Sequence, residues 1–126
     1  MTTSAFGYTE AQSRFHESSA YTRLGEVRAA LAAQDRALAL RRPDDYTDWA
    51  LTRLDRATCI ARQGDPATAA AYAIDTLTQL GTEQRHGVIT LPATELARAL
   101  PTAFQSASAA RELNDLLRSS TSSEAL

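Results

Sequence analysis

Small and apolar residues recur along this chain at spacings of three, four and seven, which place them on one face of an α-helix. Glycines and prolines that stop or start helices separate the stretches that carry this pattern. One stripe consists of Val27, Ala30, Leu31, Gln34 and Leu38, and another of Ala69, Ala70, Ala73, Ile74, Leu77 and Leu80. The pattern predicts an all-α fold of about six helices, over residues 9–24, 26–41, 44–63, 66–80, 83–100 and from 102 onward.

The clearest local signal is the tripeptide Gly64-Asp65-Pro66. Glycine takes the left-handed conformation that closes a helix. Asp65 can accept hydrogen bonds from the free amides of the next helix, and proline suits the first helical position. The tripeptide therefore predicts a tight turn between antiparallel helices. Thr9 and either Asp44 or Asp45 are expected to cap two other helices.

Two segments are less regular. Within residues 83–100, Gly87, the run Val88-Ile89-Thr90 and Pro92 weaken the first half of the predicted helix. A kink or loop before Pro92 and a straight helix both remain open. A last helix is expected to carry Phe104, Ala107, Ala110, Leu113 and Leu117. We expect an irregular segment at 1–8, a helical domain over 9–118 and a disordered, Ser-rich tail at 119–126.

Composition supports helices and disfavours a nucleic-acid partner. The chain of 126 residues has 25 alanines, few aromatic residues and no lysine. Its thirteen arginines are dispersed, as codon bias would leave them, and fifteen acids give a net charge of −2. A single cysteine, Cys59, fits a reducing compartment. No apolar run reaches the ~20 residues of a membrane span, and no signal peptide is visible. We therefore expect a cytoplasmic protein.

The chain also repeats itself. Aligning Gly25 with Gly64 superposes two turns and the helices on either side of them. Small residues match on both sides of the turn, and large apolar residues match at two further positions. The matched pairs are Ser18 with Ala57, Ala30 with Ala69, Tyr21 with Ile60, and Leu38 with Leu77. Small residues two helical turns from a tight connection let paired helices approach closely.

This spacing resembles the tetratricopeptide repeat (TPR), as in Ser18…Tyr21…Gly25-Glu26…Ala30…Ala37 and Ala57…Ile60…Gly64-Asp65…Ala69. The run 54–66, LDRATCIARQGDP, and the segments 96–101 and 110–113 resemble the C-terminal repeats of actinobacterial helix-turn-helix transcriptional regulators. The resemblance covers roughly residues 10–118 and implies a short α-solenoid. Arginines stand where a bulky residue is expected, at 14 and 53, and the spacing between the turn glycines exceeds the usual ~34 residues. No helix-turn-helix precedes the repeats, so DNA binding is not carried over.

Candidate catalytic and metal-binding residues are sparse. His16 and His86 lie on different units, and neither has a cysteine or carboxylate at metal-ligand spacing. Cys59 is expected to be a small buried residue. The acids Asp44, Asp45 and Asp48 open a helix, where the helix dipole favours negative charge. We predict no catalytic residue, metal or cofactor. An enzyme would need a cavity on which His16, Asp55 or Cys59 converges.

The resemblance implies a concave groove that holds an extended peptide or a helix. By position its lining would be Gln12, Phe15, Ser19, Thr22, Leu51, Leu54, Asp55, Thr58 and Arg62. Phe15 and Ser19 replace the polar pair that clamps a peptide carboxylate in some members, which disfavours a terminal-carboxylate ligand. The alternative interpretation is that several of these side chains pack against a neighbouring helix.

Three functions follow from these observations. The first is a non-catalytic protein-binding or self-associating module, the latter a dimer formed through apolar residues such as Tyr8 and Phe15. The second is the sensing domain of a regulator, with a peptide or small effector in its groove. The third and weakest is a small helical enzyme.

Overall fold

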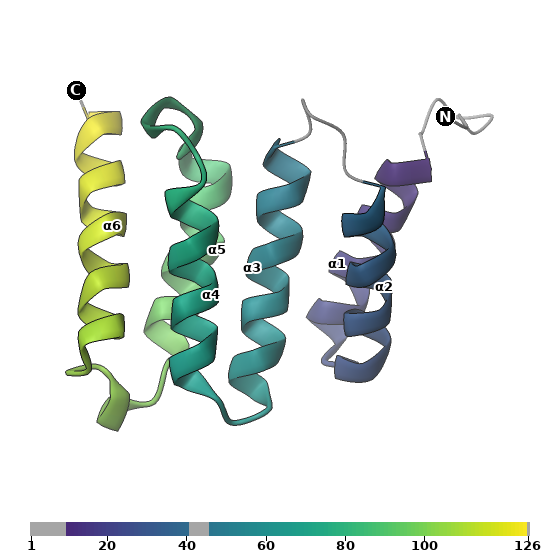
Figure 1. Cartoon of the computed structure of the whole chain (residues 1–126), viewed down its shortest axis with the longest axis horizontal. Helices are drawn as coiled ribbons and strands as arrows, with labels where there is room; N and C mark the ends of the chain where they lie inside the picture. Colours follow the sequence, from purple (N-terminus) through teal and green to yellow (C-terminus); the bar gives the residue numbers. More distant parts are fainter. Residues whose placement is uncertain (1–9, 41–45, 126) are drawn as a thin grey trace.

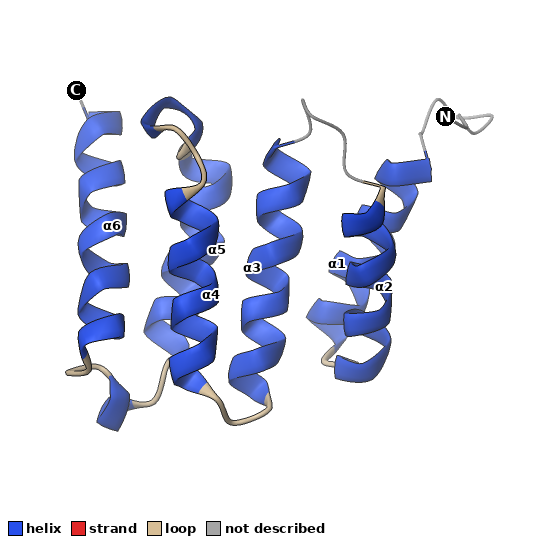
Figure 2. Ribbon diagram, in the orientation of Figure 1, coloured by secondary structure: helices blue, strands red, loops and turns tan. Residues whose placement is uncertain are grey.

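The protein is built from helical hairpins. The computed structural model describes residues 10–40 and 46–125, and over these residues it contains six α-helices and no strand. The helices are α1 (Glu10–Leu24), α2 (Val27–Ala39), α3 (Tyr46–Arg62), α4 (Pro66–Thr78), α5 (Gly87–Ala99) and α6 (Ser108–Ala125). Short 3-10 turns occupy Thr82–Gln84 and Thr102–Phe104. The all-α prediction is confirmed (Figure 2).

The helices pair as α1 with α2, α3 with α4 and α5 with α6. These pairs follow one another along the long axis of the molecule (Figure 1). Helix α3 contacts both α1 and α2 of the first hairpin, and it also contacts α5 of the third. Helix α4 contacts α6. The first helices of the hairpins, α1, α3 and α5, therefore lie next to one another.

The two repeated turns have the same backbone geometry. Gly25 has φ +76° and Gly64 has φ +90°. The amide of Gly64 donates to Ala61 O (3.0 Å) and that of Asp65 to Ile60 O (3.3 Å). The turn at Gly25 has the same two hydrogen bonds. Asp65 Oδ1 accepts from the Thr68 amide at 3.1 Å, and hydrogen bonding to the side chain and the amide of Thr68 lowers the pKa of Asp65. The predicted turn is confirmed.

Gly64→Ala is expected to destabilise the fold by about 1–2 kcal/mol, because a side chain is disfavoured at positive φ. Gly87→Ala is the matched control, since a Cβ there meets nothing within 4 Å and φ is not positive. It should be neutral or stabilise by up to about 1 kcal/mol. Urea denaturation of both variants measures the difference. Equal free energies of unfolding for the Gly64→Ala and Gly87→Ala variants would contradict the left-handed conformation of Gly64.

The small residues of the repeat lie where the hairpins pack. Ser18, Ala57, Ala30 and Ala69 are all fully buried. Of the large residues, Leu77 is fully buried, whereas Tyr21, Ile60 and Leu38 are partly exposed. Thr9, Asp44 and Asp45, which were expected to cap helices, lie outside the described residues.

The apolar core belongs mainly to the second and third hairpins. Its largest fully buried apolar side chains are Leu54, Leu77, Ile89 and Leu113. In the first hairpin the buried residues are small or polar: Ser18, Thr22, Ala30, Ala33 and Gln34. The first hairpin is therefore held to the second largely by hydrogen bonds and close packing of small groups.

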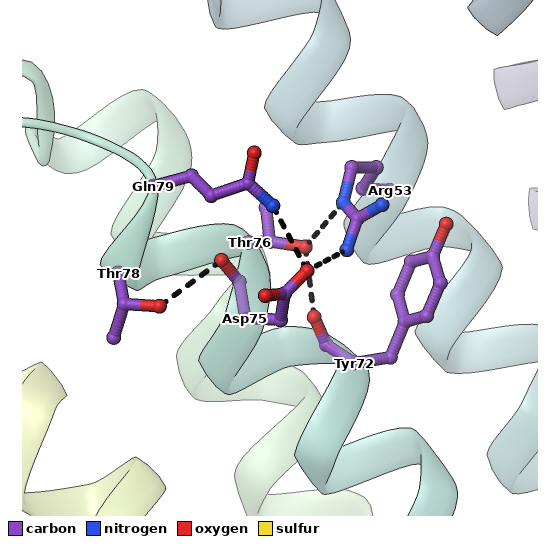
Figure 3. Close-up of polar contacts among 6 residues, drawn as sticks. All are labelled: Arg53, Tyr72, Asp75, Thr76, Thr78 and Gln79. Carbon is purple, nitrogen blue, oxygen red and sulfur yellow. Dashed lines mark hydrogen bonds and ion pairs between the residues drawn. The ribbon is translucent and has the colours of Figure 1, made fainter.

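Arg53 stands where the second repeat was expected to have a bulky residue, and Figure 3 shows its contacts with Asp75 and Thr76 of α4. Its Nε donates to Thr76 Oγ1 at 2.9 Å, and its Nη2 contacts Asp75 Oδ2 at 2.7 Å. The guanidinium carbon lies 4.0 Å from the ring centroid of Tyr72 and 5.2 Å from that of Trp49. A guanidinium over aromatic rings supplies packing area as well as charge. Arg53 therefore joins α3 to α4 in place of an aromatic side chain.

The equivalent arginine of the first repeat, Arg14, has a different partner. Glu17 lies 3.6 Å from Arg14 and accepts a 2.8 Å hydrogen bond from Arg36 of α2. The Arg36 bond is the main cause of the lowered pKa of Glu17. When Gly25 is aligned with Gly64, Arg36 of α2 takes the same position as Asp75 of α4. In the first and the second hairpin, the residue at this position of the second helix therefore forms an ion pair with the first helix.

The segment between α4 and α5 contains a break before Pro92, which is one of the two alternatives left open by the sequence. The chain turns at Thr82–Gln84, and α5 begins at Gly87, so the break precedes Pro92 by several residues. Pro92 lies inside α5. It leaves the Val88 carbonyl without its usual amide partner, and Val88 is 58 % exposed, so water can reach this end of the helix.

Helix α6 also corrects two expectations. It begins at Ser108, and Phe104 belongs to the preceding 3-10 turn. It continues to Ala125, so residues 119–125, for which the sequence predicts a disordered tail, are helical in the structure. Ser120 is 2 % exposed and its hydroxyl donates to Leu116 O at 2.9 Å. A serine that bonds the carbonyl one turn earlier is compatible with a helix, which composition alone did not indicate.

Candidate functional site

A pocket of about 460 Å³ opens between α1, α3 and α5. Each of the three hairpins contributes its first helix. The walls combine small or apolar residues with two arginines and two carboxylates. The lining residues are Thr22, Arg23, Asp55, Thr58, Ala61, Arg62, Pro92, Glu95, Leu96 and Ala99. A volume of this size lies in the range of small-ligand sites and can also take one or two side chains of a peptide.

Asp55 is the most unusual group in this pocket. Its side chain is partly buried on α3, and no described residue forms a hydrogen bond or an ion pair with its carboxylate. Burial raises the pKa of Asp55 to about 7, although the charges of Arg23 and Arg62 oppose this effect. Burial disfavours the charged form of a carboxyl group when no partner replaces water. Among the described residues, Asp55 therefore has no hydrogen-bond or ion-pair partner, although the charges of Arg23 and Arg62 attract its carboxylate.

Arg62 fixes one end of the pocket. Its Nη1 donates to Thr22 O at 2.5 Å, which joins the last turn of α3 to the last turns of α1. Thr22 itself is buried and its hydroxyl donates to Ser18 O at 2.8 Å. The carbonyl oxygens near a helix C-terminus lack intrahelical partners and favour a cation. One hydrogen bond of Arg62 therefore helps to hold α3 against α1.

A buried polar network lies behind the pocket. Gln34 of α2 donates from Nε2 to Thr22 Oγ1 at 3.2 Å and approaches Cys59 Sγ at 3.7 Å. Arg56 Nε donates to Gln34 Oε1 at 2.9 Å, and its Nη2 donates to Leu31 O at 3.0 Å. Satisfied networks of this kind hold side chains in one arrangement. The network fixes α1 and α2 against α3.

Four of the expected groove residues line the pocket: Thr22, Asp55, Thr58 and Arg62. The others do not. Gln12 is exposed on α1, Phe15 and Ser19 are partly buried nearer its N-terminal end, and Leu51 packs partly buried against the core. Leu54 is 2 % exposed and lies in the core, and it is not part of the pocket wall. The alternative of helix packing holds for Leu51 and Leu54.

The sequence prediction missed the wall formed by α5, with Pro92, Glu95, Leu96 and Ala99. It also missed Arg23 and Ala61. A signal was present, because the buried residues of α5 recur at helical spacing and leave Pro92, Glu95 and Ala99 on the opposite face. The buried residues of α5 are Ile89, Thr90, Ala93, Leu96 and Ala97.

The residues considered for catalysis do not meet. Of His16, Asp55 and Cys59, only Asp55 lines the pocket. Cys59 is fully buried beside Gln34. The ring of His16 lies 5.2 Å from that of Phe15. His86 Nε2 lies 3.2 Å from the Tyr46 hydroxyl, at the starts of α5 and α3. Among the side chains that the structure describes, no three His, Cys, Asp or Glu residues form a group that could hold a metal ion.

Comparison of the chain with protein-family models, with curated proteins and with solved structures finds no match. In the part of the chain that the structure describes, no helix has the length and apolarity needed to cross a membrane. The fold and the pocket together define the class: an all-α protein of helical hairpins with an open, charged pocket on the face formed by the first helices.

Proposed function

We propose that this protein is a non-catalytic binding module of TPR type, which holds a segment of a partner protein in the pocket between α1, α3 and α5. The pocket carries this proposal, because three consecutive hairpins contribute to it and it contains a carboxylate without a partner among the described residues. Groups that are partly desolvated and unpaired in a cleft are candidates for ligand binding.

The repeat supports the TPR part of the proposal. Both turns share their hydrogen bonds and positive φ values, and the small residues flanking them are buried at the same positions. Repeated hairpins of this kind stack into a scaffold whose concave face binds a partner. A place in a transcriptional regulatory system rests only on the resemblance of segment 54–66 and of the two C-terminal segments.

Two alternative functions have less support than the proposed binding module. The pocket volume also suits a small effector, so a sensing domain is the second candidate. Self-association through the N-terminal end rests on Tyr8, which lies outside the described residues, and on Phe15, which is partly buried. The exposed face of α6 carries Arg111, Glu112, Asp115 and Arg118, and the strongly exposed large apolar residues are Leu24 on α1 and Val88 and Leu91 on α5. A charged outer face favours a capping helix over a dimer interface.

Filling the pocket should weaken partner binding. Ala99 is exposed in the pocket wall, so Ala99→Trp places a large ring in the cavity, whereas Ala71→Trp adds the same ring to an exposed position on α4 outside it. Linear peptides selected from a random display library against the full chain should lose at least about tenfold in affinity for Ala99→Trp. They should bind Ala71→Trp normally.

Circular dichroism of both variants checks that the helices are retained. The proposal fails if repeated selection enriches no peptide, or if the enriched peptides bind the Ala99→Trp and Ala71→Trp variants equally well.

A further inference from the structure

The charged side chains of the pocket differ in their exposure to water and in their hydrogen-bond partners. Asp55 is partly buried and has no partner among the described residues, whereas Arg23 and Arg62 are exposed, and Arg62 already donates to Thr22 O. Exposed guanidinium groups are well solvated, so they have little to gain from a ligand anion. A carboxylate removed from water gains much more from a cation brought to it.

A second carboxylate stands in the wall that α5 contributes. Glu95 is exposed and lines the same pocket as Asp55 of α3. Small and apolar groups complete the walls near them, among them Ala61, Leu96 and Ala99. Lysine and arginine side chains combine a charged head with an apolar stem that packs along such surfaces. The pocket thus matches both parts of a basic side chain.

We infer that the pocket is built for a lysine or arginine side chain of the partner, with Asp55 as its ion-pairing residue and Glu95 as the second carboxylate. This inference rests on the proposed function, and it names the chemistry of the bound segment. The partner's basic head lies against Asp55, and its stem lies along the apolar wall. Hydrogen bonds between a charged donor and a carboxylate are stronger than hydrogen bonds between neutral groups.

Binding should then depend on pH. Only ionised Asp55 pairs with a cation, and the pKa of Asp55 is raised to about 7 by burial. The other charged groups of the pocket are Arg23 on α1, Arg62 on α3 and Glu95 on α5. From pH 6 to pH 8 the ionised fraction of a group with that pKa rises about tenfold, and the affinity should rise by the same factor.

The test begins with peptides selected from a random linear display library against the full chain at pH 8. We expect a lysine or arginine at one fixed position. Synthetic peptides that carry lysine or uncharged norleucine there are then compared by calorimetry. The lysine peptide should bind the wild type about tenfold more tightly or better. Its advantage and its pH dependence should both vanish in Asp55→Asn.

Asp115→Asn, on the exposed face of α6, is the matched control and should keep both effects. The inference is overturned if the selected peptides carry a fixed acidic residue, or if lysine keeps its advantage in Asp55→Asn. In either case the proposed function stands, provided that the peptides still lose affinity for Ala99→Trp. If no peptide depends on residue 99, the proposed function fails together with the inference.

Discussion

Leu77→Ala is expected to lower the free energy of unfolding by about 2–5 kcal/mol. Leu77 of α4 is fully buried in the core shared by the second and third hairpins. Removing most of its side chain loses the transfer free energy of the buried groups and leaves a cavity that close-packed neighbours fill only in part. Because domains are stable by only about 5–15 kcal/mol, this single change removes a large fraction of the stability.

Leu91→Ala is the control for this prediction. Leu91 is 62 % exposed on α5, so the same truncation there should change stability by no more than about 0.5 kcal/mol. Urea denaturation followed by circular dichroism compares the two variants. Similar losses for both would mean that α4 does not pack into a common core with α3 and α5.

Asp55→Asn is expected to stabilise the protein at pH 8 by about 2 kcal/mol, because it removes a charge that is costly to bury, and to have little effect at pH 4. The pKa of Asp55 is about 7 in the folded chain, against an ordinary value of 3.8. That difference corresponds to about 4 kcal/mol at most, and the partial exposure of the side chain reduces it to roughly half. Asparagine keeps the shape of the side chain without its charge.

The sign of the effect follows from proton binding. Below an ordinary pKa of 3.8 the carboxyl group is protonated in both states and contributes nothing. As pH rises toward 7 the unfolded chain releases the proton while the folded chain retains it, so the wild type loses stability. Thermal unfolding of wild type and variant at pH 4, 6 and 8 measures the change. A difference that is the same at all three values would contradict the partly buried, unpaired carboxylate.

A residue that lowers stability while facing an open pocket is typical of binding sites, where stability is commonly sacrificed for function. The prediction for Asp55→Asn therefore bears on function as well as on stability. The same substitution should stabilise the fold and weaken the binding of a basic peptide. Replacing a residue that serves only to hold the fold together would instead destabilise the protein.

Local interactions let the sequence predict most of the helices. The turn at Gly64-Asp65-Pro66 needs only a positive φ, a capping carboxylate and a proline at the first helical position, and all three involve neighbouring residues. The small residues Ala30 and Ala69 could be placed at helix contacts because a tight turn sets how closely two helices approach. Composition was a poorer guide, since the Ser-rich end of the chain proved to be helical.

The pocket could not be predicted in the same way. Its walls come from three helices, and which side chains meet there depends on how each hairpin is rotated against the next. Leu54 and Asp55 are adjacent in sequence, yet one lies in the core and the other in the pocket. The partners of Arg53 are likewise set by α4, which follows α3 in the chain and presents Asp75 and Thr76 to the guanidinium.

The sequence by itself thus determined the all-α class, the repeated hairpin and the turn glycines, because these depend on backbone conformation and hydrophobic periodicity over a few residues. Only the tertiary structure decided that α5 completes a pocket with α1 and α3, and that Asp55 is left there with no partner among the described residues. The physical reason is that desolvation and pairing of a charge depend on every element around it, not on its neighbours in the chain.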